Sequence, residues 1–173
     1  MTPEPAQLDA WGKQAFAEKN YDEAADYFRQ AAEGFALGRA DLSAAESRNN
    51  MSVALLKAGK PLEALEAALA TDVTFAGAKD AKRQAMALGN QAAALEELRR
   101  YDEAIEKYER SAELFASVNE GDLRSTVMKS AAALKLKSGR IAESAFKMMG
   151  AVDAKDSPTL FERVMKFFMR FIK

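Results

Sequence analysis

The side chains that most often do chemistry in proteins are scarce in this sequence. Its 173 residues include no cysteine and no histidine. This composition removes disulfides, thiolate nucleophiles and thiolate metal sites, together with the usual general base and commonest metal ligand. Adjacent acids such as Glu96 and Glu97 are typical of solvated helix faces, and no glycine-rich phosphate loop is present. We therefore expect no enzyme activity, no metal site and no cofactor.

Amides are the remaining polar groups with a regular pattern. Asn50 and Asn90 are separated by the same interval as the repeated motif described next. An amide side chain can both donate to and accept from the backbone of an extended or helical peptide. Alternatively, these asparagines hydrogen-bond to neighbouring helix ends or to water, as such side chains commonly do. The sequence leaves both interpretations open.

The elements that position these amides repeat with the same spacing. Tyr21-Asp22-Glu23-Ala24 recurs as Tyr101-Asp102-Glu103-Ala104 and, more loosely, at 61–64 and 141–144. The glutamates therefore fall at 23, 63, 103 and 143. A fixed period of this size predicts a repeat architecture.

Helical periodicity and end signals divide each repeat into two helices. The predicted helices span 6–19, 21–37, 41–58, 61–75, 78–98, 101–117, 122–138 and 140–152. Asn20 with Glu23 resembles a capping box, Asp41 is a predicted N-cap, Gly59 a predicted helix stop, and Pro61 a predicted first helical residue.

Small and aromatic residues also recur with this period. Small side chains let two helix backbones approach closely, and aromatic residues at helical spacing are ordinarily core. The clearest columns are Ala24, Ala64 and Ala104, and Phe35, Phe75 and Phe115.

Together these features resemble the tetratricopeptide repeat family. Small residues at the eighth, twentieth and twenty-seventh motif positions, with Tyr-Asp-Glu-Ala opening the second helix, are that family's signature. The period, which is longer than that family's usual one, is similar to the variety in kinesin light chains and many bacterial regulatory proteins. The resemblance implies an all-α, right-handed α-solenoid (superhelix) of four helix pairs, at about 5–38, 41–76, 78–117 and 122–152, in a domain of residues 1–156.

In that family the first helix of each pair lines a concave groove that binds a peptide or helix of another protein. The resemblance therefore implies a non-catalytic interaction scaffold with a protein or peptide partner. The groove residues that it implies are Lys13, Phe16, Asn49, Asn50, Val53, Leu56, Lys57, Met86, Asn90, Lys129, Leu136 and Lys137.

Residues 157–173 stand outside the repeat and form a predicted amphipathic helix. We expect this helix to cap the last repeat, to dock in a groove of its own or a neighbouring copy, or to lie on a membrane surface. Docking in a neighbouring copy would make a homo-oligomer. The alternative function is thus a self-assembling or membrane-surface-associated structural protein. Its docking residues would be Phe161, Val164, Met165, Phe168, Phe171 and Ile172.

The overall charge limits the classes of partner. Lys and Arg number 25 and Asp and Glu 26, so the formal net charge of −1 supplies no field that would attract nucleic acid or an anionic membrane. The first residues show neither a cationic start nor an apolar run. We expect a cytoplasmic protein that does not bind nucleic acid.

Overall fold

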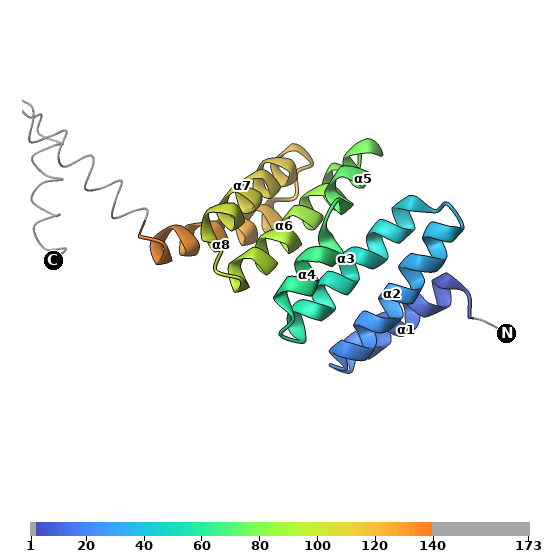
Figure 1. Ribbon diagram of the computed structural model, residues 1–173. Coiled ribbons are helices and arrows are strands. Elements are labelled where there is room, and N and C mark those ends of the chain that lie inside the picture. The colour runs from blue at the N-terminus through green and yellow to red at the C-terminus, as the bar shows by residue number, and fades with distance from the viewer. Residues whose placement is uncertain (1–2, 140–173) are drawn as a thin grey trace, which may run out of the picture. The chain divides into compact units, whose positions relative to one another are not determined.

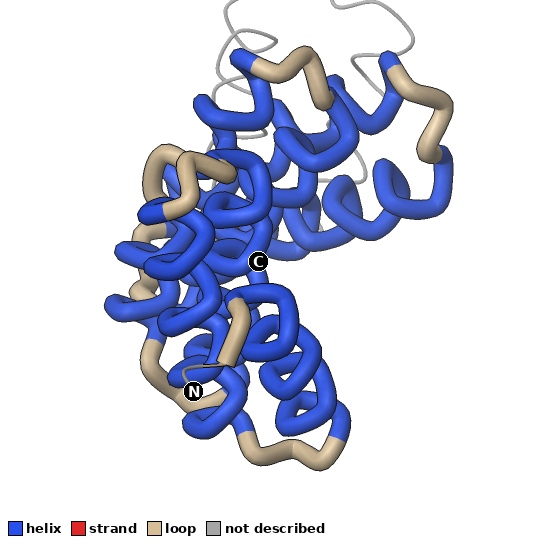
Figure 2. Tube along the Cα trace, turned by 90° about the vertical axis from the view of Figure 1, so that its right-hand side faces the viewer, coloured by secondary structure: helices blue, strands red, loops and turns tan. Residues whose placement is uncertain are grey.

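A computed structural model describes residues 3–139 (Figure 1), and every regular element within that range is an α-helix joined to the next by a short loop (Figure 2). The predicted all-α repeat fold is confirmed. The chain divides into two compact units, residues 1–132 and 133–173. The helices are α1 (Pro5–Ala17), α2 (Tyr21–Leu37), α3 (Asp41–Lys57), α4 (Pro61–Ala68), α5 (Thr71–Gly77), α6 (Ala81–Glu97), α7 (Tyr101–Ser117) and α8 (Gly121–Lys137).

Helix starts recur at a constant interval from α2 onward. Apart from α5, the helices begin at residues 21, 41, 61, 81, 101 and 121. Every second start therefore coincides with the period of the sequence motif, so that one repeat of the sequence is one pair of helices. The predicted bounds of α2 and α7 agree with the structure, and those of α1, α3, α6 and α8 differ by one to three residues.

The same turn joins successive helices. A residue with positive φ stands at positions 19, 39, 59, 79, 99, 119 and 139. At the end of α3, the N–H of Lys60 donates to the carbonyl of Leu55 at 2.9 Å, and the N–H of Gly59 donates to that of Leu56 at 3.1 Å. This pair of bonds is the Schellman closure of a helix end. The predicted stop at Gly59, with φ of 75°, is confirmed.

The predicted capping box at Asn20 does not form, and the predicted N-cap at Asp41 is wrong. Asn20 takes the N-cap position of α2 but makes no capping bond, and its backbone (φ −82°, ψ 69°) lies outside the extended region that N-cap residues prefer. Asp41 is already inside α3, whose N-cap is Ala40. A side-chain cap is present at Asp80, which accepts from the N–H of Arg83 at 2.9 Å. Pro61 occupies the first turn of α4 as predicted.

The helices of residues 3–132 pack through small side chains. α1 contacts α2, α2 contacts α3, α3 contacts α4, and α6 contacts α7. The alanines of one predicted column are fully buried at the start of α2, α4 and α7. Gly12 has the same role, since a Cβ there would lie 2.8 Å from the ring of Phe28. Of the phenylalanine column, Phe75 and Phe115 are buried and Phe35 is half-buried.

The helix predicted over 61–75 is broken, which corrects the sequence-based boundary. α4 ends at Ala68, and α5 begins at Thr71 after Ala70 in the left-handed region (φ 61°). The carbonyl of Ala68 accepts from the hydroxyl of Thr71 at 2.8 Å and from Nε2 of Gln91 at 3.0 Å. Gln91 also donates to Asp72 at 2.8 Å. A buried amide on α6 therefore satisfies the backbone group that the break leaves without a helical partner.

Replacing Ala70 by glycine is expected to raise the free energy of unfolding by about 0.5–1 kcal/mol. A left-handed backbone costs an L-residue about 1–2 kcal/mol, and the greater freedom of glycine in the unfolded chain offsets part of this gain. Gly59→Ala is the matched change in the opposite direction and is expected to cost about 1 kcal/mol. Urea unfolding followed by circular dichroism checks both variants. Shifts of the same sign in the two variants would contradict the left-handed assignment.

Candidate functional site

The first helices of the pairs, α1, α3 and α6, form a row linked by polar bridges. Ser47 on α3 donates to Asp9 on α1 at 3.1 Å. The next bridge joins Arg83 on α6 to Glu46 on α3 at 3.1 Å. We call these helices, with residues 121–132 of α8, the first-helix row. α8 joins the row where Val127 approaches Gly89, because a Cβ at Gly89 would lie 3.8 Å from Cγ1 of Val127.

Two of the predicted groove amides bond to each other across this row. Nδ2 of Asn90 donates to Oδ1 of Asn49 at 3.0 Å. Asn49 is 7% exposed and Asn90 is half-buried. Asn90 therefore has an internal partner on the neighbouring first helix, which neither sequence-based interpretation included. This bond fixes α3 against α6 and orients both amides.

Asn50 differs from Asn90 although the two share a motif position. It is half-buried, and within residues 3–139 its side chain makes no hydrogen bond. Val53 and Leu56 follow it on α3 at helical spacing, and both are half-buried. On α6, Met86 is 43% exposed. We call Asn50, Val53, Leu56 and Met86 the mixed stripe. It combines apolar surface with one amide that makes no hydrogen bond within residues 3–139.

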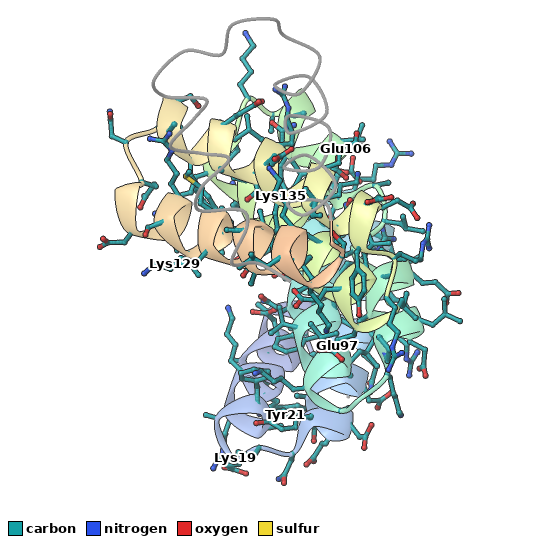
Figure 3. The ribbon with its side chains drawn as sticks, turned by 90° about the vertical axis from the view of Figure 1, so that its left-hand side faces the viewer. Lys19, Tyr21, Glu97, Glu106, Lys129 and Lys135 are labelled. Atoms are coloured by element: carbon teal, nitrogen blue, oxygen red, sulfur yellow. The ribbon has the colours of Figure 1, made fainter. Side chains whose placement is uncertain are left out.

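The predicted lysines are spread over several helices. Lys13 on α1 pairs with Asp9 at 2.6 Å, and its pKa is raised mainly by that hydrogen bond. Lys57 ends α3 and is exposed. Figure 3 shows Lys129 on α8 and Glu97 on α6, both on the surface. Leu136 and Lys137 are exposed and belong to the second compact unit.

Phe16, the remaining predicted groove position, and the acid Glu96 are both partly covered. Phe16 on α1 is half-buried, with its ring edge-on to Tyr21 at a centroid distance of 5.4 Å. Glu96 on α6 accepts from the hydroxyl of Tyr108 at 3.2 Å. Burial, followed by the charge of Glu96, raises the pKa of Tyr108 to about 12. The neutral phenol is therefore favoured, and Tyr108 serves as a packed link between α6 and α7.

The helix predicted at 157–173 lies outside the described residues. Its predicted docking residues, Phe161, Val164, Met165, Phe168, Phe171 and Ile172, therefore have no structural account, and the roles of cap, plug, oligomer contact and membrane anchor stay predictions.

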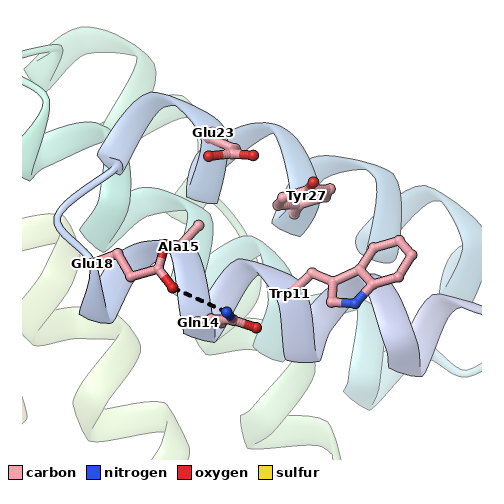
Figure 4. Close-up of a pocket in the computed structure, with 6 residues that line it drawn as sticks. All are labelled: Trp11, Gln14, Ala15, Glu18, Glu23 and Tyr27. Atoms are coloured by element: carbon pink, nitrogen blue, oxygen red, sulfur yellow. Dashed lines mark hydrogen bonds between the residues drawn. The ribbon is translucent and has the colours of Figure 1, made fainter.

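A second candidate site, which sequence reasoning missed, lies between α1 and α2. It is a pocket of about 200 Å³ lined by Trp11, Gln14 and Ala15 from α1, by Glu18, which directly follows α1, and by Glu23 and Tyr27 from α2 (Figure 4). Helical spacing predicts an amphipathic helix over 6–19, with Trp11 among its apolar residues. Trp11 is nevertheless 37% exposed, with its ring centroid 5.7 Å from that of Tyr27.

Two other kinds of site are absent from the described part of the chain. Residues 3–139 hold no group of three or more Asp or Glu side chains placed to bind a metal ion. None of the helices in this range is both long and apolar enough to cross a membrane. Comparison with models of known protein families and with curated proteins finds no match to this chain.

Proposed function

We propose that this chain is a non-catalytic interaction module of the tetratricopeptide type, which holds a peptide or helix of another protein against the first-helix row. The observation that carries the proposal is the mixed stripe beside the Asn49–Asn90 bridge. Asn50 supplies an amide that has no hydrogen bond within residues 3–139, and Met86 supplies exposed, flexible apolar surface. Amide and apolar groups side by side suit the recognition of a peptide backbone and its side chains.

The bridges across the row support this role. Rigid placement of contacting side chains reduces the entropy that is lost on binding. The bridges from Ser47 to Asp9, from Arg83 to Glu46 and from Asn90 to Asn49 each join two neighbouring first helices. A partner would therefore meet a surface that is already ordered. The absence of catalysis and a cytoplasmic location remain parts of the same proposal.

The test removes two side chains of the mixed stripe and leaves the polar bridges between the first helices intact. Asn50→Ala combined with Met86→Ala is expected to raise the Kd of a partner captured from native lysate by about tenfold, because buried contacts at the centre of an interface often contribute about 1–2 kcal/mol. The measurement is a binding isotherm with the purified partner. Unlike the bridging asparagines, Asn50 and Met86 have no hydrogen bond in the described structure whose loss would disturb the fold.

A matched control places the same kinds of change on second helices. Gln30→Ala combined with Leu62→Ala removes one amide from α2 and one exposed apolar side chain from α4. This variant is expected to bind the partner with unchanged Kd. If both variants bind as the original chain does, the first-helix row is not the binding surface.

A further inference from the structure

The pocket between α1 and α2 has the lining of a cation site. Trp11, Gln14 and Ala15 share one face of α1, and Glu18 follows as the C-cap residue of that helix. Glu23 and Tyr27 are one helical turn apart on α2. Figure 4 shows the carboxylates of Glu18 and Glu23 toward the α1–α2 loop and the rings of Tyr27 and Trp11 further along the helices. Among the described residues, no lysine or arginine lines the pocket.

The two carboxylates have no cationic partner in the described part of the chain. Glu18 accepts from Nε2 of Gln14 at 3.0 Å. Within residues 3–139, neither Glu18 nor Glu23 forms an ion pair, whereas the nearby Asp9, Asp22 and Asp26 all do. Burial, followed by the charge of Glu23, raises the pKa of Tyr27. The pocket thus combines two negative charges with two aromatic rings.

The size of the pocket limits the ligand. A volume of about 200 Å³ is below the range of about 300–1,000 Å³ that is typical of drug-sized ligands, so it fits the end of one side chain. An anion would meet two carboxylates without a counter-charge. A cation would be attracted both by the carboxylates and by the faces of Trp11 and Tyr27.

We propose that this pocket binds the guanidinium of an arginine side chain from a partner protein. A guanidinium is planar, so it can lie against the exposed indole of Trp11 while its N–H groups donate to Glu18 and Glu23. An ammonium offers the same charge without the flat face or the fork of donors. This site lies between the helices of the first pair and does not depend on the mixed stripe.

The chain supplies its own reporter, since Trp11 is its single tryptophan. Titrating the full chain with N-acetyl-argininamide at constant ionic strength is expected to give a saturable change in tryptophan fluorescence, with a Kd on the order of 1–10 mM for so small a ligand. N-acetyl-citrullinamide, which has the same shape without charge, is expected to give none. A saturable response to both compounds, or to neither, would overturn the proposal.

Substitutions test whether the carboxylates of Glu18 and Glu23 attract the argininamide. Glu18→Gln with Glu23→Gln is expected to weaken argininamide binding about tenfold. Glu66→Gln with Glu106→Gln changes the net charge equally at exposed positions on α4 and α7 that do not line the pocket. This variant is expected to leave Kd within about twofold, since salt screens exposed charges that do not contact the ligand. Equal loss in the two variants, or no loss in the first, would contradict the site.

A titration with a lysine analogue tests whether the pocket prefers arginine to lysine. N-acetyl-lysinamide is expected to bind at least about threefold more weakly, because it lacks the planar face and the bidentate donors. Equal or tighter binding of the lysine compound would overturn the assignment to arginine. These titrations use no protein partner, so their outcome is separate from that of the Asn50 and Met86 variants.

Discussion

Truncating Phe75 to alanine is expected to lower the free energy of unfolding by about 3–5 kcal/mol, the usual loss for a fully buried aromatic side chain. Phe75 lies on α5, is 0% exposed, and clusters with Ala45 of α3 and Ala87 of α6. Because both neighbours are alanines, neither has a large side chain that could fill the cavity. The guanidinium of Arg83 also lies 5.2 Å from the ring centroid, a contact that the truncation removes.

Val73→Ala is the matched control for Phe75. Val73 lies on the same short helix and is 66% exposed, so its truncation is expected to change stability by no more than about 0.5 kcal/mol. Denaturant unfolding monitored by circular dichroism measures both. A loss below about 1 kcal/mol in Phe75→Ala, well short of the usual cost of such a truncation, would mean that Phe75 does not fill the space between α3, α5 and α6.

The second large effect is expected from Ala104→Leu at the start of α7. Ala104 is 0% exposed, as are Ala24 and Ala64, which hold the same place in the two preceding repeats. A leucine at a site with no free volume forces strained rotamers or backbone shifts and costs about 1–3 kcal/mol. We expect the melting temperature to fall by about 2–4 °C for each kcal/mol lost.

The control for this change keeps the leucine and moves it to the surface. Glu106→Leu places it slightly further along α7 at an exposed position and is expected to leave the melting temperature within about 2 °C. An unchanged melting temperature in Ala104→Leu would show that the small-residue column does not mark the contact between helices, and the repeat register would then be wrong.

Much of the helix layout was predictable because it depends on local signals. Pro61 at a helix start, Gly59 at a helix end and the Tyr-Asp-Glu-Ala motif all act through their own backbone or first turn, and the structure follows them. The positions of the turns were harder to predict from residue type. Lys19, Arg39, Lys79 and Arg99 have positive φ without being glycine or asparagine, so only their regular spacing could have shown them.

The break between α4 and α5 was not predictable from local sequence. Neither Leu69 nor Ala70 is a residue that normally interrupts a helix. Besides the hydroxyl of Thr71, the side chain that bonds across the break is Gln91, which lies on a different helix, α6. The two asparagines raise the same difficulty, because whether Asn90 faces a ligand or Asn49 depends on the distance between α3 and α6.

The pocket of α1 and α2 was missed for a related reason. Helical spacing placed Trp11 on an apolar face, and an amphipathic pattern alone does not show how much of a large ring its neighbours cover. One signal was available, since Glu18 and Glu23 are acids near an aromatic residue and close to a predicted turn. Their convergence with Tyr27 depends on the pairing of the two helices, which only the fold supplies.

The recurring turn also bears on how the chain folds. Each turn is closed by backbone bonds between residues three to five positions apart, and the extensive helix contacts join helices that are close in sequence. Such local topology gives a low contact order, and helical proteins of this kind fold in microseconds to milliseconds. During synthesis at about 5–20 residues per second, a completed helix pair would therefore have seconds in which to pack before the next pair emerges.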